Sequence, residues 1–217
     1  NTVNKVFGYV RTNGTLACVP ADQQPDGKGG DIWERKYVML GLSQYYAHIE
    51  KDPRVLKLMI DEANSVIDQI GDAPKKDINS QGWSRTGIES YSVMEPMMRL
   101  YKLTGDKRYL DFCTYLIEKG GCRGANIFQE SLDNVRPRKM GNGYPKAYEM
   151  LSVYEGLAEY YRCTGDAKWE KAIMNLFENL KKYEITIIGN GGADQPYFPK
   201  WRGEAWDDTA LEQTNPK

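Results

Sequence analysis

The chain has 217 residues, of which 41% are hydrophobic and 12% aromatic, so it is long and apolar enough for a globular core in one or two domains. Its 29 basic and 30 acidic residues leave a net charge of −1, which argues against nucleic acid or an anionic membrane as a partner. His48 is the only histidine, and this excludes a histidine-based catalytic triad or a histidine metal cluster within these residues.

Residues 1–30 are rich in Gly, Asn, Asp, Pro and Thr, and we expect an irregular N-terminal segment there. From residue 31 onward the pattern becomes helical, and we expect a single all-α domain over residues 31–217. A helix that includes residues 40–46 is followed by a second one, which begins where Asp52 supplies an N-cap and Pro53 the first helical position. Apolar residues of this second helix recur at helical spacing from Val55 to Ile70.

The same two-helix unit occurs twice more. Thr-Gly-Asp turns at residues 104–106 and 164–166 each join two helical patterns. Gly105 and Gly165 suit the left-handed residue that ends a helix, and the aspartate after each of them caps the next helix. Cys113 and Cys163 fall on the apolar stripes, where we expect small buried thiols. Three copies of the unit predict an array of α-hairpins.

Long connections separate the hairpins, at residues 71–88, 120–145 and 185–217. In an up-down array they all emerge at the end opposite the short turns, where function usually resides. We call this end the rim, and the start of the first hairpin lies there too. The candidate substrate-binding residues on these segments are Trp33, Trp83, Arg85, Glu89, Tyr144 and Lys146, with Asp31 and Lys36 at the same end. Glu89 has a second interpretation, as a charge that stabilises a helix start.

The richest connection is residues 197–208, with four aromatic rings and three carboxylates in twelve residues. Aromatic rings cover the apolar faces of sugars, and a carboxyl group can protonate a glycosidic oxygen. This stretch therefore predicts a carbohydrate site, with Trp201, Glu204 and Asp208 as candidates. The alternatives are tryptophans that pack on a neighbouring helix, and solvated or capping roles for Asp207 and Asp208.

Several segments resemble glycoside hydrolase family 127, the β-L-arabinofuranosidase-like proteins, among the (α/α)-barrel glycoside hydrolases. They are residues 36–42, residues 94–106, residues 146–149 leading to Glu155-Gly156-Leu157, and Gly191-Gly192 followed by Gly203-Glu204. The resemblance implies an (α/α) toroid of six hairpins, of which this chain supplies about three. Residues 31–217 would then be a partial catalytic domain, and the chain a fragment.

The same resemblance assigns Glu204 as the general acid/base. An aromatic pocket favours the neutral carboxyl that an acid needs, and in a retaining reaction the residue would return as the base that activates water. The family also uses zinc with a cysteine nucleophile, through Cys and Glu ligands that would lie beyond Lys217. None of the four cysteines here matches those positions, so we expect no cofactor within this chain and no activity from the 217 residues alone.

Lys146 stands where many relatives have a histidine, and this departure places arabinofuranose specificity in question. Lys146 and Arg85 are suited to bind the carboxylate of an acidic sugar instead. The leading hypothesis is a glycosidase that acts on sugars from plant or microbial polysaccharides.

Two other classes of function remain open. One is a non-catalytic helical-hairpin module that binds carbohydrate. The other is a polysaccharide lyase on a similar toroid, with Tyr144 or Tyr197 as base. We expect a carbohydrate substrate and neither nucleic acid nor membrane as a partner, and we favour a periplasmic or secreted location over a cytoplasmic one; the sequence does not predict the oligomeric state.

Overall fold

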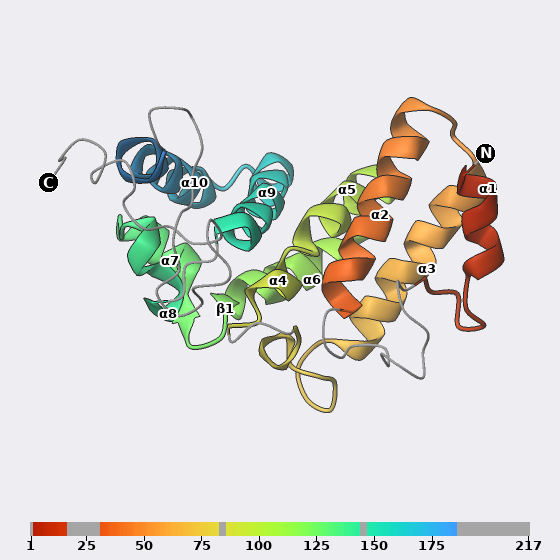
Figure 1. The fold of residues 1–217 in the computed structure, drawn as a ribbon, viewed down its shortest axis with the longest axis horizontal. Helices are drawn as coiled ribbons and strands as arrows, with labels where there is room; N and C mark the ends of the chain where they lie inside the picture. The colour runs from red at the N-terminus through yellow and green to blue at the C-terminus, as the bar shows by residue number, and fades with distance from the viewer. Residues whose placement is uncertain (1, 17–30, 83–85, 144–146, 186–217) are drawn as a thin grey trace, which may run out of the picture.

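The computed structural model describes residues 2–16, 31–82, 86–143 and 147–185, and within them three helical hairpins. The hairpins pair α2 (Asp31–His48) with α3 (Pro53–Gln69), α5 (Met94–Thr104) with α6 (Lys107–Glu118), and α9 (Ala147–Thr164) with α10 (Ala167–Asn179). The first helices of the hairpins, α2, α5 and α9, form one layer with α5 in the middle (Figure 1). The array of α-hairpins expected from the sequence is confirmed.

Shorter elements fill the connections. The chain begins with α1 (Thr2–Val6) and a 3₁₀ turn (Phe7–Tyr9), and a 3₁₀ turn (Ile78–Ser80) and α4 (Ile88–Tyr91) lie between the first two hairpins. Between the second and third hairpins come the paired strands β1 (Gly121–Cys122) and β2 (Ala125–Asn126), then α7 (Ile127–Leu132), a 3₁₀ turn (Pro137–Lys139) and α8 (Met140–Gly143). A π-helical turn, Leu180–Glu184, follows α10. Helix α7 packs against α10, so the second long connection is itself part of the helical body.

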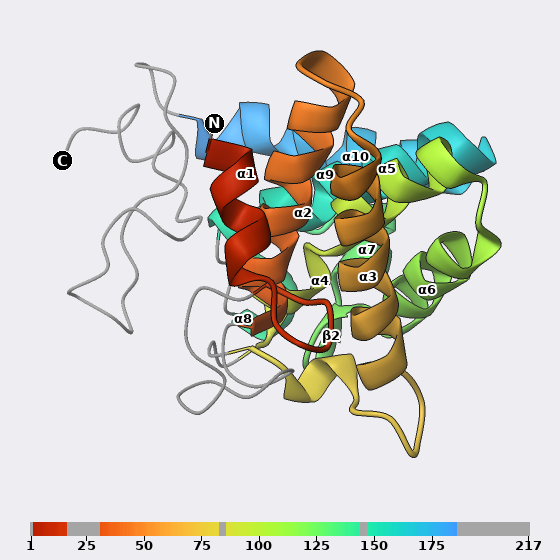
Figure 2. The same ribbon diagram turned by 90° about the vertical axis from the view of Figure 1, so that its right-hand side faces the viewer.

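The short helix α1 lies in the segment that the sequence predicts to be irregular. Val3, Val6 and Phe7 pack against the core, and Figure 2 shows α1 alongside α2. A five-residue helix is not stable by itself in water, so these tertiary contacts stabilise it. The polar composition of residues 1–30 concealed this helix, because only a few apolar side chains of the segment make the contacts that stabilise it.

The three short turns have the predicted chemistry. The side chains of Asp52, Asp106 and Asp166 accept the backbone N–H two residues ahead, at 2.8, 3.0 and 2.9 Å. Gly105 has φ +71° and Gly165 φ +68°, the left-handed conformation that ends a helix. In Figure 1 the α2–α3 turn lies at the upper edge of the molecule, and the segment between α3 and α4 lies at the lower edge. The first hairpin thus separates a short-turn end from a long-connection end, as the sequence predicts.

Helices α5 and α9 approach closely at Gly156. A Cβ atom at this position would lie 2.8 Å from Cβ of Met94 and 2.9 Å from the backbone nitrogen of Glu95. Both distances are too short for a side chain, so glycine sets the separation of the two helices. Met97 and Leu157 are fully buried in the core that the close approach creates.

A buried ionic group holds the start of α2 against α3. The Arg35 Nε donates to Glu62 at 2.8 Å, its Nη2 donates to the Glu62 carbonyl at 2.9 Å, and its Nη1 lies 3.5 Å from Asp31. All three side chains are fully buried. Glu62 also accepts the backbone N–H of Leu16, so the group joins the N-terminal segment to the first hairpin.

Among the described helices, none is both long and apolar enough to cross a bilayer.

Candidate functional site

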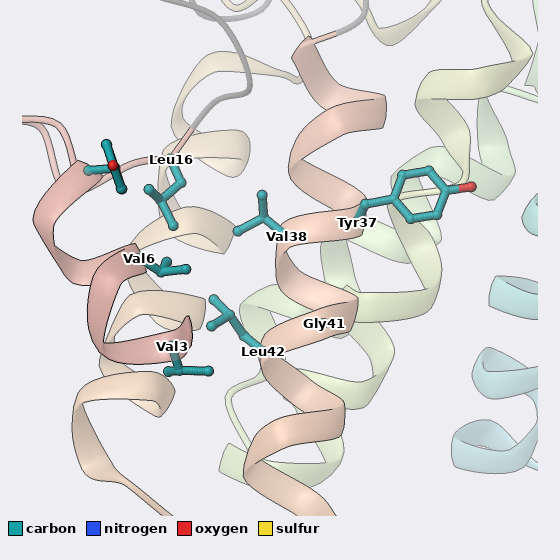
Figure 3. Close-up of a pocket in the computed structure, with 8 residues that line it drawn as sticks. Val3, Val6, Leu16, Tyr37, Val38, Gly41 and Leu42 are labelled. Atoms are coloured by element: carbon teal, nitrogen blue, oxygen red, sulfur yellow. The ribbon is translucent and has the colours of Figure 1, made fainter. Parts of the chain in front are cut away.

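Three aromatic rings meet at the starts of α2 and α9. The Trp33 ring lies edge-on to Tyr37 of the same helix, with centroids 5.1 Å apart, and edge-on to Tyr148 of α9, at 5.7 Å. The hydroxyl groups of Tyr37 and Tyr148 hydrogen-bond to each other. In Figure 3 the Tyr37 side chain extends from α2 on the side away from α1. Tyr148 is 56% exposed and Tyr37 39%, so the group presents aromatic surface to solvent beside the long connections.

Lys36 lies under these rings, with its ammonium 4.6 Å from the Trp33 ring centroid and 4.5 Å from that of Tyr37. Its side chain is only 2% exposed. Burial lowers the pKa of Lys36, although the nearby carboxylates of Glu95, Glu155 and Glu149 act to raise it. A cation held between rings and carboxylates fixes α2 relative to α5 and α9.

Farther along the same faces, α5 and α9 carry two polar stripes that meet. The residues are Glu95, Arg99 and Lys102 on α5, and Glu155, Glu159 and Arg162 on α9, which we call the α5–α9 charge ladder. In each helix they follow at intervals of four and three residues, which places them on one face. The ladder therefore runs away from the aromatic rings toward the short turns.

The end of the ladder near the aromatic rings consists of two carboxyl groups, those of Glu95 and Glu155. Arg99 donates to Oε1 of Glu95 at 2.8 Å, and the Glu95 side chain also acts on the Glu155 carboxyl group of α9. Glu95 is 6% exposed, whereas Glu155 is exposed. Desolvation, followed by the negative charge of Glu95, raises the pKa of Glu155, and the cations Lys36 and Arg99 only partly offset this. The arrangement therefore retains a proton on Glu155 to higher pH than on an ordinary glutamate.

At the end of the ladder near the short turns, the charged groups form ion pairs. Lys102 donates to Glu159 at 2.7 Å and Arg162 donates to it at 2.6 Å. Desolvation opposes ionisation here, but the hydrogen bond from Lys102 and the positive charges of Lys102, Arg162 and Arg99 outweigh it and lower the pKa of Glu159. The ladder thus changes along its length, from a carboxyl pair near the rings to a closed ion-pair cluster near the turns.

A separate hollow of about 590 Å³ opens between α1 and α2 (Figure 3). Its described lining is apolar apart from tyrosine hydroxyls and backbone; the aliphatic members are Val3, Val6, Leu16, Val38 and Leu42. Among the described residues this lining has no charged side chain, and Tyr9 and Tyr37 are its titratable groups.

Two of the sequence-predicted site residues lie in the described part of the chain. Trp33 belongs to the aromatic group, at the position expected for it. Glu89 lies in the first turn of α4 and is fully buried, beside Gly82, where the absence of a side chain leaves room for its carboxylate. The other predicted residues are outside the described residues: Trp83, Arg85, Tyr144, Lys146, Trp201, Glu204 and Asp208.

The sequence did not single out Tyr148, Glu95 or Glu155 as site residues. Tyr148 has a signal, since it follows the second long connection by a few residues and is the first aromatic residue of its helix. Glu95 and Glu155 have a weaker signal, since each is followed on its helix by charged residues four and seven positions later. The charged stripes of α5 and α9 face each other because the two helices approach at Gly156, and the sequence does not show this packing.

The zinc that the family resemblance implies stays a prediction, because the described residues contain no site for it. Within these residues there is no group of three or more His, Cys, Asp or Glu side chains arranged to hold a metal ion. Burial raises the pKa of the Cys113 and Cys122 thiols, which disfavours the thiolate that zinc binds. We therefore assign no zinc ligand among them.

Over residues 5–210 the sequence matches the family model of the β-L-arabinofuranosidase GH127 catalytic domain. The chain belongs to this family. Among curated proteins, a search finds no match to the sequence. The residues that match the family model include all three hairpins and Glu204, and they begin within α1.

Solved structures show the same fold at low sequence identity. A GH127 β-arabinofuranosidase superposes with a TM-score of 0.60 at 21% identity, over 82% of this chain and 26% of that one. A GH127 β-L-arabinofuranosidase from Geobacillus stearothermophilus T6 gives 0.59 at 19%, over 82% and 29%. A GH76 α-mannanase from Bacteroides thetaiotaomicron gives 0.60 at 17%, over 91% and 57%. The hairpins are therefore those of an (α/α) toroid, and the GH127 chain spans under a third of the length of these GH127 structures.

Proposed function

We propose that the protein that carries this chain is a glycoside hydrolase with Glu204 as its general acid/base. The observation that carries the proposal is the GH127 catalytic-domain match over residues 5–210, which includes the Gly203-Glu204 element. The proposed substrate is a glycoside derived from plant or microbial polysaccharide, resembling a β-L-arabinofuranoside. The described geometry supports a sugar as ligand because Trp33, Tyr37 and Tyr148 present rings beside charged groups.

In the proposed reaction the Glu204 carboxyl protonates the glycosidic oxygen as the bond to the leaving group breaks. In the second half of a retaining reaction its carboxylate takes a proton from water. Trp33, with the rings of residues outside the described part, would hold the sugar by stacking. We retain the predicted substrate contacts as part of the proposal: Trp33, Trp83, Arg85, Glu89, Tyr144, Lys146, Trp201 and Asp208.

The test replaces Glu204 by glutamine in the protein that carries this chain. With p-nitrophenyl β-L-arabinofuranoside as probe, Glu204→Gln should lower kcat by about 10²–10⁴, because the amide cannot donate or accept the proton, while far-ultraviolet circular dichroism stays unchanged. Glu178→Gln is the matched control, since Glu178 is exposed on α10 and pairs only with Lys181 among the described residues. Normal turnover in Glu204→Gln would overturn the assignment.

The same assay separates the other classes of function. A binding module would hold L-arabinose or an arabinan oligosaccharide without releasing product from any glycoside. A lyase would release unsaturated sugars that absorb in the near ultraviolet, with no uptake of water.

A further inference from the structure

The ring of Tyr148 is exposed to solvent although contacts on two sides fix its position. Its hydroxyl group hydrogen-bonds to that of Tyr37 on α2, and the Trp33 ring lies edge-on to it at a centroid distance of 5.7 Å. Nevertheless 56% of Tyr148 is exposed, whereas Trp33 is half-buried. A ring whose orientation is fixed before binding loses little conformational freedom when a ligand covers it. Tyr148 therefore has the properties of a preformed contact surface, and Trp33 those of its support.

The contact with Trp33 leaves at least one face of the Tyr148 ring uncovered. The two ring planes are inclined by 75°, so the edge of one ring points at the face of the other. If the Tyr148 edge points at Trp33, Trp33 covers neither face of Tyr148, and in the opposite arrangement it covers one. Aromatic faces carry partial negative charge and attract the C–H groups on the apolar face of a sugar ring. The geometry thus provides a flat surface of the kind on which sugar rings stack.

The two tyrosine hydroxyl groups supply the polar contacts that a sugar also requires. One hydroxyl donates to the other, so one O–H hydrogen occupies the shared bond and the second points elsewhere. Among the described residues, neither hydroxyl has a further hydrogen-bond partner. Desolvation, followed by the bond to Tyr148, raises the pKa of Tyr37, so this phenol keeps its hydrogen in neutral solution. The pair can therefore donate one hydrogen bond to a sugar oxygen and accept others from sugar hydroxyls.

Buried charged groups hold the α2 side of this surface in place. The Lys36 ammonium lies 4.6 Å from the Trp33 ring centroid and 4.5 Å from that of Tyr37. One residue earlier in the chain, Arg35 donates to Glu62 of α3 at 2.8 Å, with both side chains fully buried. These contacts anchor the helical turn that carries the two rings, so the core of the molecule sets their positions before any ligand binds.

We propose that Tyr148 and Tyr37 form a saccharide subsite, in which the Tyr148 ring stacks on the sugar and the paired hydroxyls bind its oxygens. This inference rests on the proposed function, and neither tyrosine is among the substrate contacts predicted from the sequence. The subsite joins α2 and α9 near the first residues of both helices. Stacking needs the flat ring and hydrogen bonding needs the hydroxyl, so different substitutions of Tyr148 separate the two contributions.

The experiment measures KM and kcat in the protein that carries this chain, with methyl β-L-arabinofuranoside, whose leaving group contains no ring that could stack. Tyr148→Ala should raise KM about tenfold with little change in kcat, because the stacked area is lost. Tyr148→Phe and Tyr37→Phe keep both rings and should each raise KM about threefold, the loss of one hydrogen bond. Phe177→Ala is the control, since Phe177 is an aromatic residue of α10 that is 49% exposed, and its KM should equal that of wild type. An unchanged KM in Tyr148→Ala, or a Tyr148→Phe variant as impaired as Tyr148→Ala, would overturn the inference.

Isothermal calorimetry with L-arabinose and the same variants separates this inference from the proposed function. If wild type hydrolyses no glycoside, the proposed function fails, and the L-arabinose affinities of wild type and Tyr148→Ala still decide whether the subsite exists. If Glu204→Gln abolishes turnover and Tyr148→Ala binds L-arabinose as wild type does, only the subsite fails. Absence of L-arabinose binding by wild type would also reject the subsite.

Urea unfolding distinguishes binding from a purely structural role of the Tyr148 ring. We expect Tyr148→Phe to unfold at nearly the wild-type urea concentration, so its KM reports the binding of a folded protein. A lower free energy of unfolding in Tyr148→Ala together with unchanged L-arabinose affinity would mean that the ring packs against another part of the protein. That result would replace the subsite by a packing surface.

Discussion

Arg35 and Glu62 join α2 to α3 through a 2.8 Å hydrogen bond between two fully buried charged side chains. The residues on either side of this bond along α2 include Trp33 and Lys36, which belong to the aromatic group. The buried pair thus anchors the helix turn from which the candidate site projects. Its contribution can be measured because each member can be removed separately.

Arg35→Met should lower the free energy of unfolding by about 3–5 kcal/mol, because the carboxylates of Glu62 and Asp31 would remain buried without their cation. The measurement is urea denaturation followed by circular dichroism. The double variant Arg35→Met/Glu62→Met should cost much less than the sum of the two single changes, since a buried ion pair can be replaced by apolar packing. Additive costs in this double-mutant cycle would mean that the pair is not coupled.

Gly156→Ala should destabilise the fold by about 1–3 kcal/mol, because its Cβ would press on Met94 and on the backbone of Glu95. Gly41→Ala on α2 is the matched control: nothing lies within 4 Å of a Cβ there, and alanine should stabilise the helix by about 0.5–1 kcal/mol. Thermal unfolding of both variants checks the opposite signs. Equal shifts in Tm would contradict the close approach of α5 and α9.

The Asp106→Asn variant should lose less stability than wild type as the pH falls into the acid range. Hydrogen bonds from the Arg108 side chain and backbone lower the pKa of Asp106 below 3.8, so its contribution is present above that value and is lost as pH falls through the lowered pKa. Asparagine retains the N-cap acceptor but does not titrate. Tm measured from pH 6 downward should therefore fall less steeply in Asp106→Asn than in wild type, and Asp111→Asn, at an exposed position of α6, should follow wild type.

The hairpins were predictable because their signals are local. Gly105 and the Asp106 cap lie next to each other in the chain, and the apolar stripes recur every turn. Helix α1 was not predictable from propensity, since its stability depends on contacts with the core made by Val3, Val6 and Phe7. The elements of the second long connection depend in the same way on packing, as the contact of α7 with α10 illustrates.

The candidate site was predictable only in part. The half-buried Trp33 lies near the start of α2 beside the exposed Tyr37 and Tyr148, a position that follows from hairpin topology, whereas its role in binding stays a prediction. The effect of Glu95 on the pKa of Glu155 was not predictable, because it depends on how closely two helices approach and on their relative rotation. Sequence periodicity gives the face of each helix, but it does not give the partner of that face.

The Thr-Gly-Asp turns have a consequence for how the molecule folds. Each turn reverses the chain within a few residues, so the two helices of a hairpin can pair at a small cost in loop-closure entropy. Structures dominated by such short-range contacts fold faster than those that need distant segments to meet, and hairpin arrays can nucleate in one unit and propagate to its neighbours. With α5 between α2 and α9, the central hairpin is the unit on which both neighbours can assemble, and substitutions that slow its formation should slow folding of the whole array.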